Sequence, residues 1–103
     1  MTELVTENPQ ERIQNFLKLD EYRQRLSQMA IEASTSVVVD FEDLLIADQS
    51  LAENVIEKPD EYLEYANNAA FDQLRFEDPE YAERIKDLGI TVRFRGLPHL
   101  TLM

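Results

Sequence analysis

The sequence predicts a mainly α-helical single domain of four to five helices with a small two-stranded β element. Three observations support this prediction. Apolar residues recur at spacings of three and four over most of the chain, which is the period of an amphipathic helix. Two short stretches, residues 37–39 and 91–95, instead have the composition of strands. Finally, 103 residues suffice for one hydrophobic core and leave no room for a second domain.

The first helix is expected to begin near Gln10, to run for about five or six turns and to end at the hydroxyl-bearing residues 34–36. Short hydroxyl side chains compete for backbone hydrogen bonds, so they favour a helix end. The apolar stripe of this helix consists of Ile13, Phe16, Leu17, Leu19, Tyr22, Leu26, Met29, Ala30 and Ala33.

The valines at 37–39 predict a buried strand, because β-branched side chains pack well on a pleated surface. Asp40 follows as the expected N-cap of a helix whose apolar face starts at Leu44 and Leu45. A single strand needs a partner, and the other strand-like stretch is residues 90–95. We therefore expect these two segments, far apart in the chain, to lie side by side.

Caps and prolines mark the remaining helices. Asp48 predicts the start of one helix, and Pro59 both ends it and suits the first turn of the next. Asp78 with Pro79 repeats this pattern for a last short helix, which Gly89 is expected to close in the left-handed conformation. The side chains expected to face inward are Tyr62, Leu63, Ala66, Ala70, Phe71, Leu74, Tyr81, Ala82, Ile85, Leu88, Ile90, Val92 and Phe94.

The charge of the chain bears on its partners. It has 21 acidic and 10 basic residues, a formal net charge of −11. Such a surface repels phosphate, and non-specific DNA binding depends on lysine and arginine. We therefore expect most of the domain to face away from DNA. The acids end at Asp87, and the tail after it carries Arg93, Arg95 and His99, so any contact with nucleic acid is expected there.

Several classes of site are not expected. Without cysteine there is no disulfide or thiolate metal site, and a single histidine argues against zinc. The two glycines do not form a phosphate-binding loop. We expect no catalytic, cofactor or metal site in this chain. It has no apolar run long enough to span a membrane and no signal segment, which predicts a cytoplasmic, nucleoid-associated protein, or a nuclear one in a eukaryote.

One acidic cluster, Asp40, Glu42 and Asp43, could in principle hold a hard cation through its carboxylate oxygens. The simpler interpretation is helix capping, because acids in the first turn of a helix interact favourably with its dipole. We therefore predict a structural role for these acids.

Arg93 and Arg95 are the candidate contact residues. They are two residues apart and so lie on the same face of the predicted strand, where both guanidinium groups could bind one anion. In the structural alternative, Arg93 pairs with Asp40 or with another carboxylate near the partner strand. In the functional alternative, these arginines contact DNA or a neighbouring subunit.

Several blocks of sequence, taken together, resemble the N-terminal region of the minichromosome maintenance (MCM) replicative helicases of archaeal type. The resemblance covers roughly residues 10–98, with the blocks in the order of the family. These blocks are residues 38–44 (VVDFEDL), then Asp48, Leu51 and Ala52, then residues 57–61 (EKPDE), and finally Val92, Arg93, Phe94, Leu97 and Pro98.

The resemblance implies a non-catalytic domain. In this family the region is a mostly helical subdomain on the outside of a hexameric ring, packed on an oligonucleotide-binding barrel that surrounds DNA. Its implied role is regulation and assembly of an ATP-dependent helicase that unwinds duplex DNA. The implied partners are the rest of the chain and neighbouring subunits of a hexamer or double hexamer; DNA is contacted through the parent protein, and no membrane is involved.

The resemblance also implies boundaries and structural residues. Residues 1–98 correspond to the helical subdomain and residues 99–103 to the start of a link into the barrel. ATP, magnesium and zinc are expected only in downstream domains. The implied structural positions are Asp40, Phe41 and Leu44 in the strand-to-helix block, Val92, Phe94 and Pro98 at the junction with the barrel, with Pro59 and Gly89 added from the helix boundaries.

Two departures from the family stand out: Lys58 precedes Pro59 where a small capping residue is usual, and residues 75–89 form a longer segment. Two other functional classes remain open. A free-standing acidic adaptor, or a DNA mimic, would bind a basic partner through its carboxylates. A small enzyme would need a pocket lined by carboxylates with perturbed pKa values.

Overall fold

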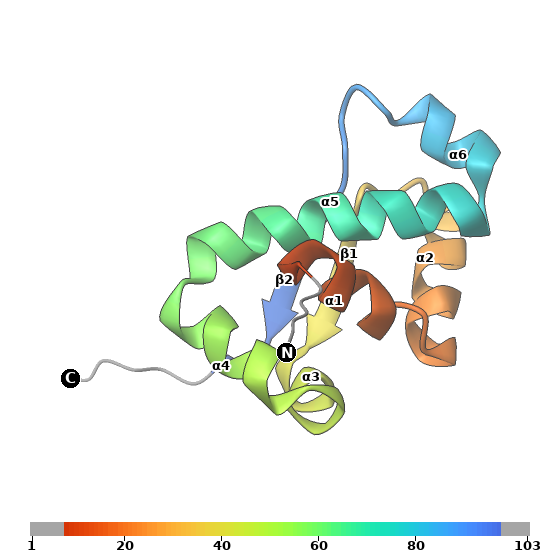
Figure 1. Cartoon of the computed structure of the whole chain (residues 1–103). Helices are drawn as coiled ribbons and strands as arrows, with labels where there is room; N and C mark the ends of the chain where they lie inside the picture. Colours follow the sequence, from red (N-terminus) through yellow and green to blue (C-terminus); the bar gives the residue numbers. More distant parts are fainter. Residues whose placement is uncertain (1–7, 98–103) are drawn as a thin grey trace, which may run out of the picture.

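The computed structural model describes residues 8–97 and confirms a mainly helical fold with a small two-stranded sheet (Figure 1). In chain order the elements are α1 (Pro9–Phe16), α2 (Asp20–Glu32), β1 (Ser36–Asp40), α3 (Phe41–Ala47), α4 (Gln49–Glu57), α5 (Pro59–Glu77), α6 (Pro79–Arg84) and β2 (Thr91–Arg95).

The predicted pairing of the two strand segments is confirmed. β1 and β2 are parallel, and their register sets Ser36 opposite Thr91 and Asp40 opposite Arg95. Parallel strands need a long crossover, which the chain from α3 to α6 supplies. The two strands at either end of this crossover, β1 and β2, therefore meet in one sheet.

The core lies between the sheet and α5, the longest helix, which crosses the molecule (Figure 1). Ala66, Ala69 and Ala70 of α5 are almost fully buried, and their small size lets other elements approach the helix closely. One face of the sheet packs inward through Val37, Val39 and Val92, as predicted, with Phe94 partly buried beside them.

Side chains close part of both outer edges of the sheet. Thr91 N–H donates to the Thr35 carbonyl, so Val92 N–H points the other way, and it donates to Asn67 Oδ1 of α5 at 2.7 Å. On the far side of β1, α2 supplies Arg25, which donates to the Val38 carbonyl oxygen at 2.8 Å. Such contacts satisfy edge groups that would otherwise be open to another strand.

Polar side chains also tie the N-terminal helices to α5. Gln10 of α1 donates to Asp72 at 2.9 Å, and Arg23 of α2 forms an ion pair with Glu77 at 3.0 Å. These contacts join residues far apart in the chain, so they fix α1 and α2 in position against the long helix.

The single long first helix predicted from the sequence is wrong, because α1 and α2 replace it; the described range therefore holds six helices, not four or five. With about 100° between successive residues, Tyr22 and Leu26 would lie on average roughly 130° around a continuous helix from Ile13 and Phe16. One straight helix with a single narrow apolar stripe would leave part of this set exposed. The chain breaks at residues 17–19, and all four side chains reach the core.

Most predicted helix boundaries are confirmed. The carboxylates of Asp48 and Asp78 accept hydrogen bonds from backbone N–H groups in the first turns of α4 and α6. Pro59 is the first residue of α5. Gly89 has the predicted left-handed conformation, with a φ of 73°, but the prediction that it closes the last helix is wrong, because α6 ends at Arg84 and turns separate it from Gly89.

Asp40 is an exception to these confirmed caps. It occupies the N-cap position of α3, as predicted, but its side chain makes no capping hydrogen bond. The carboxylate turns instead toward Arg25 and Arg95. The capping explanation of this residue is therefore wrong.

Three leucines predicted to face the core are exposed: Leu19, Leu45 and Leu88. Leu19 lies in the break between α1 and α2, outside either apolar stripe. Leu88 is 77% exposed because α6 ends at Arg84 and the following residues form turns instead of continuing the helical face.

Pro98, predicted to be structural, and residues 99–103, predicted to begin a link to another domain, lie outside the described range. Between residues 8 and 97, no helix is both long and apolar enough to cross a membrane.

Candidate functional site

Charged side chains from three elements meet at the carboxyl end of the sheet, where β1 turns into α3. Asp40 ends β1 and Arg95 ends β2, so the parallel register sets them directly opposite each other. Arg25 reaches the same place from α2, which runs beside β1. Residues distant in the sequence thereby form one cluster.

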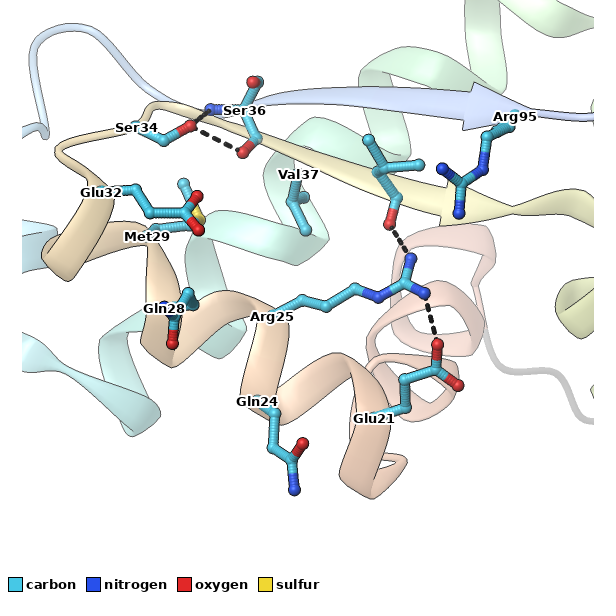
Figure 2. A pocket seen from close by; sticks show the side chains of 11 residues that line it. Glu21, Gln24, Arg25, Gln28, Met29, Glu32, Ser34, Ser36, Val37 and Arg95 are labelled. Carbon is cyan, nitrogen blue, oxygen red and sulfur yellow. Dashed lines mark hydrogen bonds and ion pairs between the residues drawn. The ribbon is translucent and has the colours of Figure 1, made fainter.

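The Asp40 carboxylate accepts hydrogen bonds from both guanidinium groups. Arg95 makes a two-point contact, with Nε 2.5 Å from Oδ1 and Nη2 3.1 Å from Oδ2. Arg25 donates from Nη2 to Oδ2 at 3.0 Å. It also pairs with Glu21 one turn earlier in α2, as Figure 2 shows. Hydrogen bonds between ionised groups are stronger than neutral ones, so the cluster braces α2 against both strands.

Tyr22 contacts this cluster through both its hydroxyl and its ring. Its hydroxyl donates to Asp43 Oδ2 at 2.7 Å and accepts from the Asp40 backbone N–H at 3.0 Å. The guanidinium of Arg25 lies over the Tyr22 ring, 4.7 Å from the centroid, in a cation–π contact. The phenol ring therefore helps to hold the arginine in place.

The contacts shift two pKa values in opposite directions. The hydrogen bond from Arg95 lowers the pKa of Asp40 below its ordinary value, against the opposing effect of burial, and Arg25 adds to the shift. Burial raises the pKa of Tyr22 well above its ordinary value, and the hydrogen bond to Asp43 raises it further. At neutral pH the carboxylate is charged and the phenol is neutral, as their hydrogen bonds require.

The structure brings together an acidic group that differs from the predicted one. Oxygens of Glu21, Asp40 and Asp43 lie within 4.8 Å of one another, whereas Glu42 points to solvent and is not part of the group. Arg25 already donates to the first two of these carboxylates, and Tyr22 donates to Asp43. The positive charge that a cation would supply is present as guanidinium, so the group fits an ion-pair network.

Arg93 and Arg95 share a face of β2, as predicted, but they have different surroundings. Arg95 is the partner of Asp40, the role that the structural alternative gave to Arg93. Arg93 lies opposite Val38 in the sheet and is exposed. Within residues 8–97 no carboxylate forms an ion pair with it.

A groove of about 550 Å³ lies between α2 and β1 (Figure 2). Gln24 and Gln28 of α2 line one side, and Ser36 lines the strand side. The two guanidinium groups in its lining, those of Arg25 and Arg95, are already bound to carboxylates. The groove therefore offers polar surface without a free cation.

Sequence reasoning missed the roles of Arg25 and Asn67. Nothing local in the sequence distinguishes Arg25 from its neighbours, because its role depends on where β1 lies. Asn67 gave a usable signal: it lies on the apolar stripe of α5 between Leu63 and Phe71. A polar side chain at such a position predicts a buried hydrogen-bond partner.

Comparison with known proteins identifies one family. The family model described as the MCM N-terminal domain matches residues 10–96. No curated protein matches the chain. The matched residues extend from α1 to the end of β2, and so include the sheet and the charged cluster. The family match confirms the resemblance to the N-terminal region of the MCM helicases, and the chain therefore belongs to the MCM N-terminal domain family.

Proposed function

We propose that this chain is the non-catalytic regulatory and assembly module at the N-terminus of a hexameric, ATP-dependent MCM DNA helicase of archaeal type. The family match carries the proposal, because it covers the described fold from α1 to β2. The module acts by docking on an adjacent DNA-binding barrel and on neighbouring subunits.

Docking is supported by the way the domain uses its charged groups. Asp40, Arg25 and Arg95 satisfy one another, and Arg12 is bound to Asp48. These contacts join elements that are distant in the chain and so stiffen the domain. A stiff body suits a module that positions other parts of a machine.

The net charge of −11 supports a position away from DNA, because duplex DNA carries one negative charge per roughly 1.7 Å of its axis. DNA would be contacted by the parent protein, and ATP, magnesium and zinc would be bound by downstream domains. The protein would work where chromosomal DNA is replicated, in the cytoplasm at the nucleoid or in a nucleus.

Deletion of residues 1–97 from the full-length helicase subunit tests this proposal. The deleted protein should still hydrolyse ATP, whereas ring assembly and DNA unwinding should change, because the docking module is gone. Size measurement in solution and a strand-separation assay provide the readouts. Loss of ATP hydrolysis in a correctly folded deletion variant would place catalysis in this domain and contradict the proposal.

DNA binding by the chain alone provides a second test. The affinity should be weak, with little dependence on salt, since few phosphates would be contacted. A steep salt dependence would contradict the proposed position away from DNA. If the deletion changed nothing and the chain instead displaced duplex DNA from a basic protein, the adaptor or DNA-mimic alternative would replace this proposal.

A further inference from the structure

One face of the two-stranded sheet packs on the core, and the opposite face is open. The register and the alternation of strand side chains place Ser36, Val38 and Asp40 on the open face, with Thr91, Arg93 and Arg95 beside them. The three side chains from β2 are exposed, and the three from β1 are half-buried. The groove between α2 and β1 borders this face (Figure 2).

Arg93 has no counter-charge within the described domain. Most arginines there are ion-paired, and the exceptions are Arg84 and Arg93. The open sheet face has one carboxylate, that of Asp40, and Arg95 and Arg25 already saturate it. Although the chain has an excess of acids, Arg93 is unpaired within residues 8–97 because no free carboxylate lies on its face of the sheet.

A protein carboxylate fits this guanidinium better than a DNA phosphate does. DNA would bring a dense row of negative charges against a chain of net charge −11, and Arg95 is already neutralised by Asp40. A folded protein surface brings one carboxylate among mixed charges. Arg suits that contact because its planar fork binds both carboxylate oxygens.

We propose that the open sheet face is the docking surface for the domain that follows β2 in the parent chain, and that Arg93 forms an ion pair there with a carboxylate of that domain. This inference rests on the proposed function. Arg93 lies two residues before the end of β2. A domain attached at that end is held beside the open face at high effective concentration, so a contact of modest strength suffices.

The test uses the full-length subunit carrying Arg93→Glu, with Arg84→Glu as the matched control. Both variants reverse an exposed arginine that lacks an ion pair in residues 8–97, and Arg84 lies on α6, away from the sheet. Hydrogen exchange of the β1 and β2 peptides reports docking. Arg93→Glu should raise exchange there several-fold, whereas Arg84→Glu should not. Both variants of the isolated chain should keep the Tm of the unchanged chain.

A charge-swap experiment identifies the carboxylate that pairs with Arg93. A scan that replaces each Asp and Glu of the following domain by Lys in the Arg93→Glu background should find one position that restores slow exchange. The inference is overturned if Arg93→Glu behaves like Arg84→Glu, if no position rescues, or if the variant lowers the Tm of the isolated chain. It is also overturned if the effect of Arg93→Glu disappears in a monomeric subunit, because the partner of Arg93 is then a neighbouring subunit. A fall of about 1 in the salt slope of DNA binding would overturn it too, because Arg93 would then contact a phosphate.

Failure of this inference is distinguishable from failure of the proposed function. If deletion of residues 1–97 changes ring assembly while Arg93→Glu has no effect, the domain docks through another surface. If the deletion itself changes nothing, the proposed function fails, and the role of Arg93 in it fails as well.

Discussion

Asp40 and Arg95 lie directly opposite each other at the ends of the two parallel strands and form a two-point ion pair, with Nε 2.5 Å from Oδ1. This pair holds together segments separated by more than half the chain. Because Arg25 binds the same carboxylate from α2, one acidic side chain links β1, β2 and α2. Loss of one of these side chains should therefore lower the stability of the isolated chain.

Arg25→Met should destabilise the domain by about 2 kcal/mol, because hydrogen bonds to charged groups contribute roughly 1.5–3 kcal/mol. The variant loses the contacts to Asp40 and to the Val38 carbonyl but keeps the aliphatic stem. Urea unfolding gives the free-energy difference. Gln24→Met is the control, because it changes an exposed neighbour on the same helix. Equal effects of the two changes would show that Arg25 does not brace the sheet.

Tyr22→Phe should cost about 1–2 kcal/mol, because it removes one hydroxyl and leaves the Asp40 N–H and the Asp43 carboxylate without that partner. The ring itself stays in the core. Tyr65→Phe is the chemically matched control: within residues 8–97 the Tyr65 hydroxyl donates a hydrogen bond only to Glu61, at the surface, so its removal should change stability little. The prediction is wrong if thermal unfolding ranks the two variants in the opposite order.

Asn67→Ala should destabilise the domain by roughly 1–3 kcal/mol, the cost of leaving the Val92 N–H of β2 unpaired. Asn68→Ala gains the same helix propensity at an exposed position, so it should be neutral or slightly stabilising. Chemical denaturation of both variants separates the edge contact from the propensity effect. A stabilised Asn67→Ala variant would refute the proposed closure of the strand edge.

The lowered pKa of Asp40 predicts a dependence of stability on acid. Since the pKa is lower in the folded than in the unfolded chain, the group stabilises the fold above the ordinary aspartate pKa of 3.8, and this contribution is lost as pH falls through the folded value. Asp40→Asn should lower stability at pH 7 and flatten the stability profile below about pH 4. Urea midpoints between pH 7 and pH 2.5 would show this; parallel profiles would contradict it.

The overall fold was readable from the sequence because its signals are local. The valines at 37–39 and the alternation after Gly89 predicted the strands, and Asp48, Pro59 and Asp78 marked helix starts. Each of these signals arises from the chemistry of a few adjacent residues. Pairing then followed, because the sequence offers no other strand.

The break between α1 and α2 could also have been predicted. The spacing of six residues from Phe16 to Tyr22 moves the apolar stripe roughly 120° around a continuous helix. Spacings of three and four residues recur on both sides of this step, so the spacing alone does not show that the apolar face has moved. Tertiary burial of both stripes outweighs the cost of starting α2 without a side-chain cap at Leu19.

The partner of Asp40 could not have been predicted. Choosing between Arg93 and Arg95 requires both the direction of pairing and the register to within one residue, and a shift of one residue changes the face of every side chain. Strand ends read from sequence are uncertain by more than that. The site therefore depends on long-range geometry, and the fold depends mainly on local signals.

A pair of double-mutant cycles on the isolated chain tests most directly the claim that Arg95 is an internal brace and Arg93 is free. One cycle combines Asp40→Ala with Arg95→Ala, and the other combines it with Arg93→Ala, with unfolding free energies measured at low salt. We expect favourable coupling between Asp40 and Arg95 and none that exceeds experimental error between Asp40 and Arg93. Coupling to Arg93 in place of Arg95 would contradict the strand register and the role assigned to each arginine.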